Sequence, residues 1–339
     1  MVLHVPALFN NLTSLNGNFM RMKGSLMLFV MLPLLFESCQ KEIDGSLVPA
    51  LAAPPKPDTL TTGWSKILLS GETTISDIFF SSASTGFLCA SKLYKSVDGG
   101  NTWLPVLEGH RFTNIYMRND SKAYFVEYPI WETLDGGNTI ISATEIGNAQ
   151  DVFILDDTYG FATTPNGIYQ TYGGGPWTRI FTVGLNLSGG YSSLFFLAGP
   201  KGWIVSSSGV YKSFGGSITS WQKATVTGGS GAPFASIHVP SANIVYVANY
   251  QGQVYKSTDA GTSFSLLKQF AATGFMDLHF IDDLNGYACI DRFVFKTSDG
   301  GVTWNRVVAL GQNILHEIHF TDSSHGWACG DGGTVLIFK

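Results

Sequence analysis

The sequence predicts an all-β fold, a seven-bladed β-propeller with four-stranded blades, over residues 61–339. Three observations predict it. A pair formed by a small residue, usually glycine, and an aromatic residue recurs every 37 to 43 residues, which is the length of one four-stranded blade. The 39 glycines and the 13% share of aromatic residues suit many short strands joined by tight turns. The last unit lacks a fourth strand, which a strand-like segment at Trp64 can supply.

Seven units align on this pair, and each holds four strand-like runs. In the clearest unit these are residues 278–281, 287–290, 293–296 and an outer run that starts at Trp304. Three short runs and an outer strand repeated at about 40 residues are typical of propeller blades. The aligned pairs are Gly86-Phe87, Ala123-Tyr124, Gly160-Phe161, Gly202-Trp203, Val245-Tyr246, Gly286-Tyr287 and Gly326-Trp327.

A second motif, Ser/Thr-x-Asp-x-Gly-x-Thr-Trp, follows the third run. It is complete at 96–103 and 297–304 and nearly complete at 133–140 and 257–264, whereas 171–177 and 213–221 have lost the aspartate. An aspartate accepts N–H bonds inside a tight turn, glycine supplies a positive φ, and the aromatic residue packs between blades. We therefore assign a structural role to Asp98, Trp103, Asp135, Asp259, Phe264, Asp299 and Trp304.

The two ends of the repeat complete each other. The last unit stops at Lys339 after its third run, and Trp64 begins an outer run that has no blade of its own. This run is predicted to complete the last blade and close the ring, so that no long sheet edge stays exposed. Trp64 then becomes the seventh outer-strand anchor beside Trp103, Ile140, Trp177, Trp221, Phe264 and Trp304.

The second motif resembles the Asp-box, or BNR repeat, of sialidases and related propellers. Over residues 61–339 the pattern is similar to the propeller family of the photosystem II assembly and stability factor, whose repeats also carry a Gly-Trp pair followed by Asp-Gly-Gly-x-Thr-Trp. The resemblance implies the fold. It does not carry a function, because the loops of a propeller set what it binds.

The N-terminal 38 residues are predicted to be a signal peptide, with translation starting at Met20 or Met22. Arg21 and Lys23 precede an apolar run at 24–36, which is too short to span a bilayer. The run ends in a lipobox-like Leu-Phe-Glu-Ser-Cys segment, which predicts a lipidated Cys39.

Phe36 and Glu37 depart from the usual lipobox, and the alternative is an ordinary secretory signal with a leftover cysteine. Residues 39–60 include four prolines and are predicted to form a tether. The protein is thus expected to be exported and lipid-anchored in the bacterial envelope, at the outer membrane, and either periplasmic or surface-exposed.

One polar position begins the inner strand of every unit. If the inner strands line the central channel, these side chains converge at one mouth, either as a site for a cation or polar ligand or as caps of strand starts that meet solvent. Two positions further on, His238, His279 and His319 share a column with aromatic residues, which indicates packing or, alternatively, a metal or pH-sensing cluster. The mouth ring comprises Asp77, Asn114, Asp151, Ser193, Ser236, Asp277 and Glu317.

The loops between blades and between second and third strands share the face opposite the Asp-boxes. Exposed aromatic and arginine side chains are frequent binding hot spots. The candidate binding face therefore presents Arg111, Tyr128, Tyr250, Arg292 and His316.

No catalytic residue, metal ligand set or cofactor motif is predicted. The sialidase resemblance requires three arginines around the substrate, and only Arg111 and Arg292 fall on the right face. The net charge of -5 argues against a nucleic acid partner. The leading prediction is a monomeric, non-catalytic envelope lipoprotein that binds a protein partner as an assembly factor or adaptor. The alternative is a carbohydrate-binding propeller or a divergent glycoside hydrolase.

Overall fold

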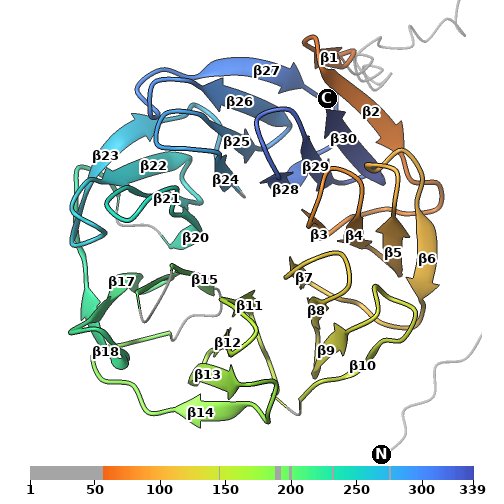
Figure 1. Ribbon diagram of the computed structural model, residues 1–339. Helices are drawn as coiled ribbons and strands as arrows, with labels where there is room; N and C mark the ends of the chain where they lie inside the picture. The colour runs from red at the N-terminus through yellow and green to blue at the C-terminus, as the bar shows by residue number, and fades with distance from the viewer. Residues whose placement is uncertain (1–55, 145, 188–191, 198–200, 231–232, 275) are drawn as a thin grey trace, which may run out of the picture. The chain divides into compact units, whose positions relative to one another are not determined.

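The computed structural model describes residues 56–339 except 145, 188–191, 198–200, 231–232 and 275. The predicted signal peptide, Cys39 and most of the predicted tether lie outside the described residues. Within them, seven sheets of mainly antiparallel strands follow one another around a ring, and each sheet has one edge strand at the centre (Figure 1). The prediction of an all-β, seven-bladed propeller is confirmed. No helix among the described residues is long and apolar enough to cross a membrane.

We number the blades in chain order of their inner strands. Blade 1 comprises β3 (Asp77–Phe80), β4 (Gly86–Cys89), β5 (Leu93–Ser96) and β6 (Leu104–Leu107). Blade 2 comprises β7 (Asn114–Met117), β8 (Ala123–Val126), β9 (Ile130–Thr133) and β10 (Ile141–Ser142). Blade 3 comprises β11 (Asp151–Ile154), β12 (Tyr159–Thr164), β13 (Gly167–Tyr172) and β14 (Thr178–Ile180).

Blade 4 comprises β15 (Ser192–Phe196), β16 (Gly202–Ser206), β17 (Gly209–Phe214) and β18 (Ser217–Lys223). Blade 5 comprises β20 (Phe234–His238), β21 (Val245–Asn249), β22 (Gln253–Ser257) and β23 (Ser263–Gln269), and β19 (Thr225–Thr227) pairs in parallel with β23. Blade 6 comprises β24 (Met276–Phe280), β25 (Gly286–Ile290), β26 (Phe293–Thr297) and β27 (Asn305–Ala309). Blade 7 has β28 (Leu315–Phe320), β29 (Gly326–Gly330) and β30 (Thr334–Phe338).

The N-terminal segment closes the ring as predicted. Strand β2 (Trp64–Leu68) pairs antiparallel with β30 and becomes the fourth strand of blade 7, with Trp64 opposite Phe338. Strand β1 (Thr59–Leu60) pairs with β27 of blade 6. The strand pairing therefore begins two residues before the predicted propeller boundary at Thr61, inside the segment predicted as tether.

The recurring Gly-aromatic pair joins neighbouring blades. Trp327 of blade 7 stacks on Phe80 of blade 1, with ring centroids 3.6 Å apart, and Trp103 meets the same phenylalanine edge-on. A side chain on Gly86 would place its Cβ 2.6 Å from the Phe80 ring, so only glycine fits there. The same stacking joins Tyr246 to Phe280 and Tyr287 to Phe320. The motif thus reports aromatic packing between blades.

The Asp-box residues hold tight turns between third and fourth strands. In blade 1, the Asp98 carboxylate accepts bonds from the Thr102 amide at 3.0 Å and the Thr102 hydroxyl at 2.6 Å. Partial burial raises the pKa of Asp98, but these bonds outweigh it and lower the pKa to about 2. Asp135, Asp259 and Asp299 make the corresponding bonds in blades 2, 5 and 6.

Each turn is also bonded to the preceding blade. The Trp327 indole donates to the Gly99 carbonyl, the Trp203 indole to the Ala260 carbonyl, and the Tyr246 hydroxyl to the Gly300 carbonyl, at 2.9 to 3.0 Å. The Asp-boxes therefore serve as joints between blades. Phe264 and Trp103 are buried, and the Trp304 indole donates to the carbonyl of Gly301 in its own turn.

Candidate binding site at the channel mouth

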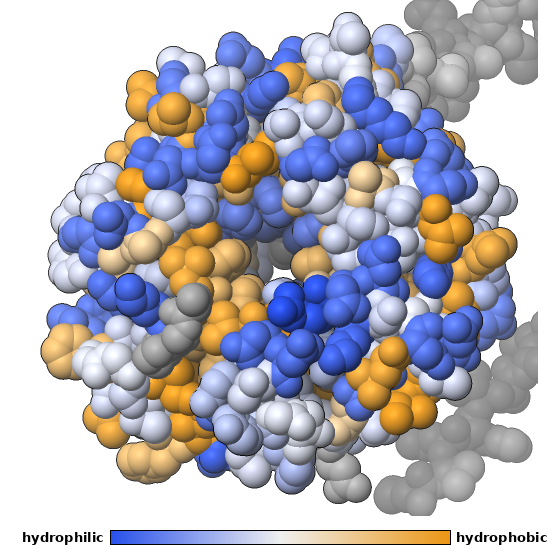
Figure 2. All heavy atoms as spheres, in the orientation of Figure 1, coloured by the Kyte–Doolittle hydropathy of each residue, from blue (hydrophilic) through white to orange (hydrophobic). Residues whose placement is uncertain are grey.

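A cavity of about 570 Å³ lies at one mouth of the central channel, and Figure 2 shows the ring open at its centre. Its lining combines members of the predicted polar ring with the residues that precede them in the chain. Two residues of the predicted binding face, Tyr250 and His316, also line it. The ring members at the cavity are Asp77, Asn114, Asp151, Ser193, Asp277 and Glu317.

The ring carboxylates bond across blade boundaries. Asp77 of blade 1 accepts from the Ile115 amide of blade 2 at 2.5 Å. Asp151 of blade 3 accepts from the Leu194 amide of blade 4 at 2.9 Å. In both cases the donor is the residue directly after the polar-ring member of the next blade. The polar ring is therefore a joint between inner strands as well as a lining of the mouth.

Two further members continue the same pattern on the opposite side of the ring. The Ser236 hydroxyl donates to Asp277 at 2.6 Å and accepts from the Leu278 amide at 3.2 Å. Asp277 accepts in turn from the Ile318 amide of blade 7 at 3.1 Å. From the sequence, the polar ring can be interpreted either as strand caps or as a ligand site. Hydrogen bonding between neighbouring blades is a third role, which neither interpretation includes.

Burial raises the pKa values of these carboxyl groups. The pKa of Asp77 rises to about 7, although the hydrogen bonds from the Ile115 and Ile78 amides lower it. The pKa of Asp151 also rises to about 7, although the hydrogen bond from the Leu194 amide lowers it. Burial followed by the charge of Asp277 raises the pKa of Glu317 well above its usual range. The hydrogen bond between Asp277 and Glu317 raises the pKa of Glu317 further and lowers that of Asp277, although burial leaves the pKa of Asp277 raised.

An aromatic belt lies deeper in the channel, below the polar ring. Its seven side chains contact one another in a closed circle, with centroids 4.2 to 5.4 Å apart. The three histidines complete this circle, so the contacts support packing, the first of the two roles considered for them. The members of the aromatic belt are Phe79, Tyr116, Phe153, Phe195, His238, His279 and His319.

The belt histidines are neutral and two of them bond to the next blade. Burial lowers the pKa of His238 to about 3 and that of His319 to about 4. The His238 Nδ1 atom accepts from the Phe280 amide at 3.3 Å, and His319 Nε2 donates to the Phe80 carbonyl at 2.8 Å. Among the described residues, no group of three or more His, Cys, Asp or Glu could hold a metal ion.

The predicted binding-face residues divide into two groups. Tyr250 and His316 border the cavity, and His316 Nε2 lies 2.9 Å from the Asp331 carboxylate. Arg111, Tyr128 and Arg292 lie on loops of the same face but do not line the cavity.

Each residue of the second group has its own local setting. The Arg111 amide donates to Glu127 at 2.8 Å, Tyr128 is 71% exposed, and the Arg292 guanidinium lies 5.4 Å from the centroid of the Phe293 ring. The structure thus brings two of the five predicted residues together at the mouth.

Sequence reasoning missed the residues just before the ring members. Ser76, Thr113, Gln150 and Ser192 line the mouth cavity, each one position ahead of a ring residue. The repeat alignment contained this signal, because His316 holds the same position in blade 7. The missed carboxylate Glu127 lies 2.7 Å from His110 on the same face.

No protein-family model and no curated protein sequence matches the chain. Among solved structures it is similar to YCF48 bound to D1 peptide, with 20% identity, 85% of this chain and 99% of that chain covered, and a TM-score of 0.66. YCF48 from Cyanidioschyzon merolae is 20% identical, with 81% of this chain and 98% of that chain covered and a TM-score of 0.65. An ancestral GH74 enzyme is 15% identical, with 80% of this chain and 45% of that chain covered and a TM-score of 0.61. The TM-scores show that the chain shares the propeller fold with these proteins, and at identities this low the likeness shows the fold alone.

Proposed function

We propose that this protein is a non-catalytic binding module that takes an extended segment of a protein partner at the channel mouth. The observation that carries the proposal is the open mouth cavity of about 570 Å³, whose border joins Tyr250 and His316 to polar side chains from several blades. An amphipathic aromatic side chain beside many hydrogen-bonding groups suits a peptide backbone with mixed side chains. The likeness in fold to YCF48 bound to D1 peptide supports a peptide-sized ligand.

The buried carboxyl ring supports a binding role over a hydrolytic one. Asp77, Asp151 and Asp277 each accept a backbone N–H from the neighbouring blade, so their oxygens are committed to the scaffold. A general acid or nucleophile has to reach its substrate within hydrogen-bonding distance. These three aspartates are already used to hold blades together.

The proposal includes a place in the cell. The predicted signal peptide and lipobox-like segment support an exported protein held in the bacterial envelope through Cys39. Cells grown with an alkyne-tagged fatty acid should label the chain, and Cys39→Ser should lose both the label and membrane retention. An unlabelled chain in the soluble fraction would remove the lipid anchor from the proposal.

Affinity capture tests the binding role. Residues 56–339 are expected to retain one protein from envelope extract, and a synthetic peptide from that protein is expected to compete. Tyr250→Ala and His316→Ala combined remove the two predicted binding-face residues that line the cavity and should weaken binding of the peptide by at least about tenfold, as loss of hot-spot side chains does.

A matched control separates the mouth face from general effects of the substitutions. Tyr172→Ala and His325→Ala combined remove the same residue types away from the mouth cavity, and this variant should bind as the parent does. Equal losses in both double variants would contradict the proposed site. Retention of glycan without protein would favour the carbohydrate-binding alternative instead.

A further inference from the structure

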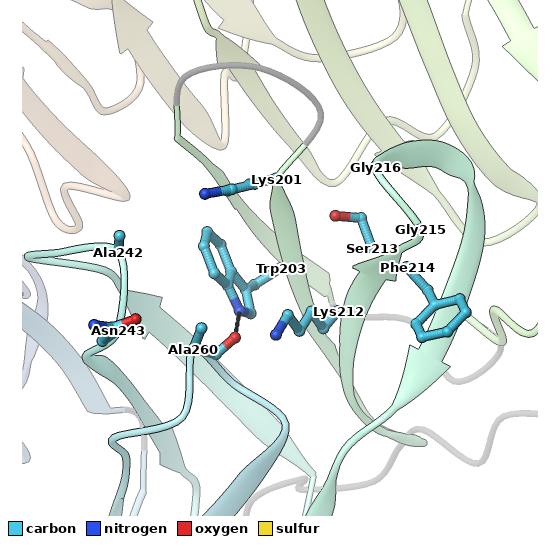
Figure 3. Close-up of a pocket in the computed structure, with 10 residues that line it drawn as sticks. All are labelled: Lys201, Trp203, Lys212, Ser213, Phe214, Gly215, Gly216, Ala242, Asn243 and Ala260. Carbon is cyan, nitrogen blue, oxygen red and sulfur yellow. Dashed lines mark hydrogen bonds between the residues drawn. The ribbon is translucent and has the colours of Figure 1, made fainter.

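A second pocket, of about 380 Å³, lies between blades 4 and 5 beside the Asp-box turns (Figure 3). Its floor is the indole of Trp203, which is 1% exposed and fixed by the bond from its Nε1 to the Ala260 carbonyl. Lys201 and Lys212 flank the indole in Figure 3. None of the described residues that line the pocket is acidic, and two of them are lysines.

Blade 2 shows a repeat in which the corresponding lysine is neutralised. Lys122 holds the position of Lys201, one residue before the repeated pair, and its ammonium lies 3.0 Å from the carboxylate of Asp157 in the next blade. The residue at the Asp157 position of blade 5 is Ala242, which lines the pocket. The carboxylate that faces the lysine in blade 2 is therefore replaced by a methyl group.

The Asp-box of blade 4 has lost its carboxylate as well. Gly215 stands where Asp98 stands in blade 1, and Gly215 and Gly216 have φ values of +65° and +70°. They join Phe214 to Ser217 as a two-residue hairpin turn, which needs positive φ at both positions. The turn is thus held by glycine conformation, without a carboxylate.

The two lysines have no carboxylate partner among the described residues. Among the described residues, neither Lys201 nor Lys212 forms an ion pair, and the Lys212 ammonium donates to the Thr262 hydroxyl at 3.2 Å. Two ammonium groups at the edge of a partly apolar cavity attract an anion more strongly than they do in open water. Ala242 and Gly215 thus stand at this place where Asp157 and Asp98 stand in the corresponding positions of other blades.

We propose that this pocket binds a small ligand through an oxyanion, a phosphate, sulfate or carboxylate, placed between Lys201 and Lys212. The Asn243 amide adds a hydrogen-bond donor, and Phe214, which is 62% exposed, offers an apolar surface to the rest of the ligand. The volume is that of a small-molecule site. The site lies beside the Asp-box turns and is independent of the proposed partner at the mouth.

Calorimetric titration of the full chain tests the proposal with glucose 6-phosphate, galactose 6-sulfate, glucuronate, inorganic phosphate and neutral glucose. At least one anionic sugar is expected to bind with a Kd on the order of 1 mM, and glucose is not. Binding should weaken as salt is raised. Comparison of the sugar phosphate with inorganic phosphate shows whether the sugar contributes.

Two kinds of variant locate the site. Lys201→Gln with Lys212→Gln should weaken binding by at least about tenfold, whereas Lys56→Gln with Lys223→Gln, the same charge change at exposed positions outside the pocket, should not. Ala242→Asp introduces the carboxylate that faces Lys122 at the corresponding position of blade 3 and should abolish binding without lowering the melting temperature. Equal affinity in the parent and the Lys201/Lys212 variant, or no binding by any anionic probe, would overturn the proposal.

Discussion

Gly86 shows how one missing methyl group permits a joint between blades. The ring of Phe80 lies over it, stacked at 3.6 Å on Trp327 of blade 7. We expect Gly86→Ala to lower the free energy of unfolding by about 1–3 kcal/mol, because the added Cβ would lie 2.6 Å from that ring and the tight stack has to shift. Urea denaturation of the variant and the parent measures the difference.

A double-mutant cycle identifies the cause of that loss. In a Phe80→Leu background the aromatic ring is gone, so the same Gly86→Ala change should cost less than half as much. An unchanged cost would mean that contacts other than the Phe80 ring oppose the added methyl group.

Strand β2 holds the ring closed, at the scale of single elements. Trp64 is 8% exposed and lies 5.3 Å from Phe338 and 6.2 Å from Phe320, measured between ring centroids. A chain that starts at Ser70 loses this strand and leaves the buried strand β30 with an open edge. Loss of one buried tryptophan alone costs about 3–5 kcal/mol, so this chain should melt well below one that starts at Lys56.

Thermal unfolding followed by circular dichroism, with size-exclusion chromatography, measures this effect. A synthetic peptide of residues 56–69 added in trans is expected to recover part of the lost melting temperature, because it supplies the missing pairing. Equal melting temperatures for the two truncated chains would show that the seven sheets hold together without the closing strand.

Elements that repeat in the sequence were predictable, and elements that depend on a neighbour were not. The spacing of the Gly-aromatic pair and the orphan strand at Trp64 predicted seven blades and their closure. Strand β1 was missed because Thr59 and Leu60 have no repeat counterpart and gain their partners only from β27. The same holds for β19, which lies parallel to β23.

The site followed the same division. The alignment placed Asp77 and Asp151 at the mouth, but their bonds to Ile115 and Leu194 join strands about 40 residues apart. No periodicity reports which amide of the next blade a carboxylate reaches. Ala242 and Gly215 drew no functional interpretation from the sequence because their importance lies in what Asp157 and Asp98 do in other blades.

At the scale of the whole ring, the two inner circles give opposite dependences of stability on pH. The pKa of Asp151 rises from 3.8 unfolded to about 7 folded, so the folded state holds the extra proton between those values and stability falls as pH rises through them. The pKa of His279 falls well below 6.5 because of burial and then the charges of His238 and His319. The unfolded state then binds more protons below pH 6.5, and stability rises with pH.

Two single variants separate these contributions when urea denaturation is measured at pH 5 and pH 8. Relative to the parent, His279→Phe should gain about 2 kcal/mol more at pH 5 than at pH 8, since it removes a group that only the unfolded chain protonates at pH 5. Asp151→Asn should gain roughly 2–3 kcal/mol more at pH 8 than at pH 5, since it removes a carboxyl group that ionises at a cost in the folded ring.

The crossing of the two responses is the informative outcome, because any fixed cost of a lost hydrogen bond or altered packing cancels between the two pH values. Phenylalanine suits position 279, since Phe79, Phe153 and Phe195 hold the same place in three other blades. If the difference in free energy of unfolding between each variant and the parent were the same at both pH values, Asp151 and His279 would titrate as they do in the unfolded chain. Asp151 would then be charged in the folded ring. Opposite shifts would mean that the contributions of Asp151 and His279 to the free energy of unfolding change with pH in opposite directions and offset each other between about pH 4 and 6.5.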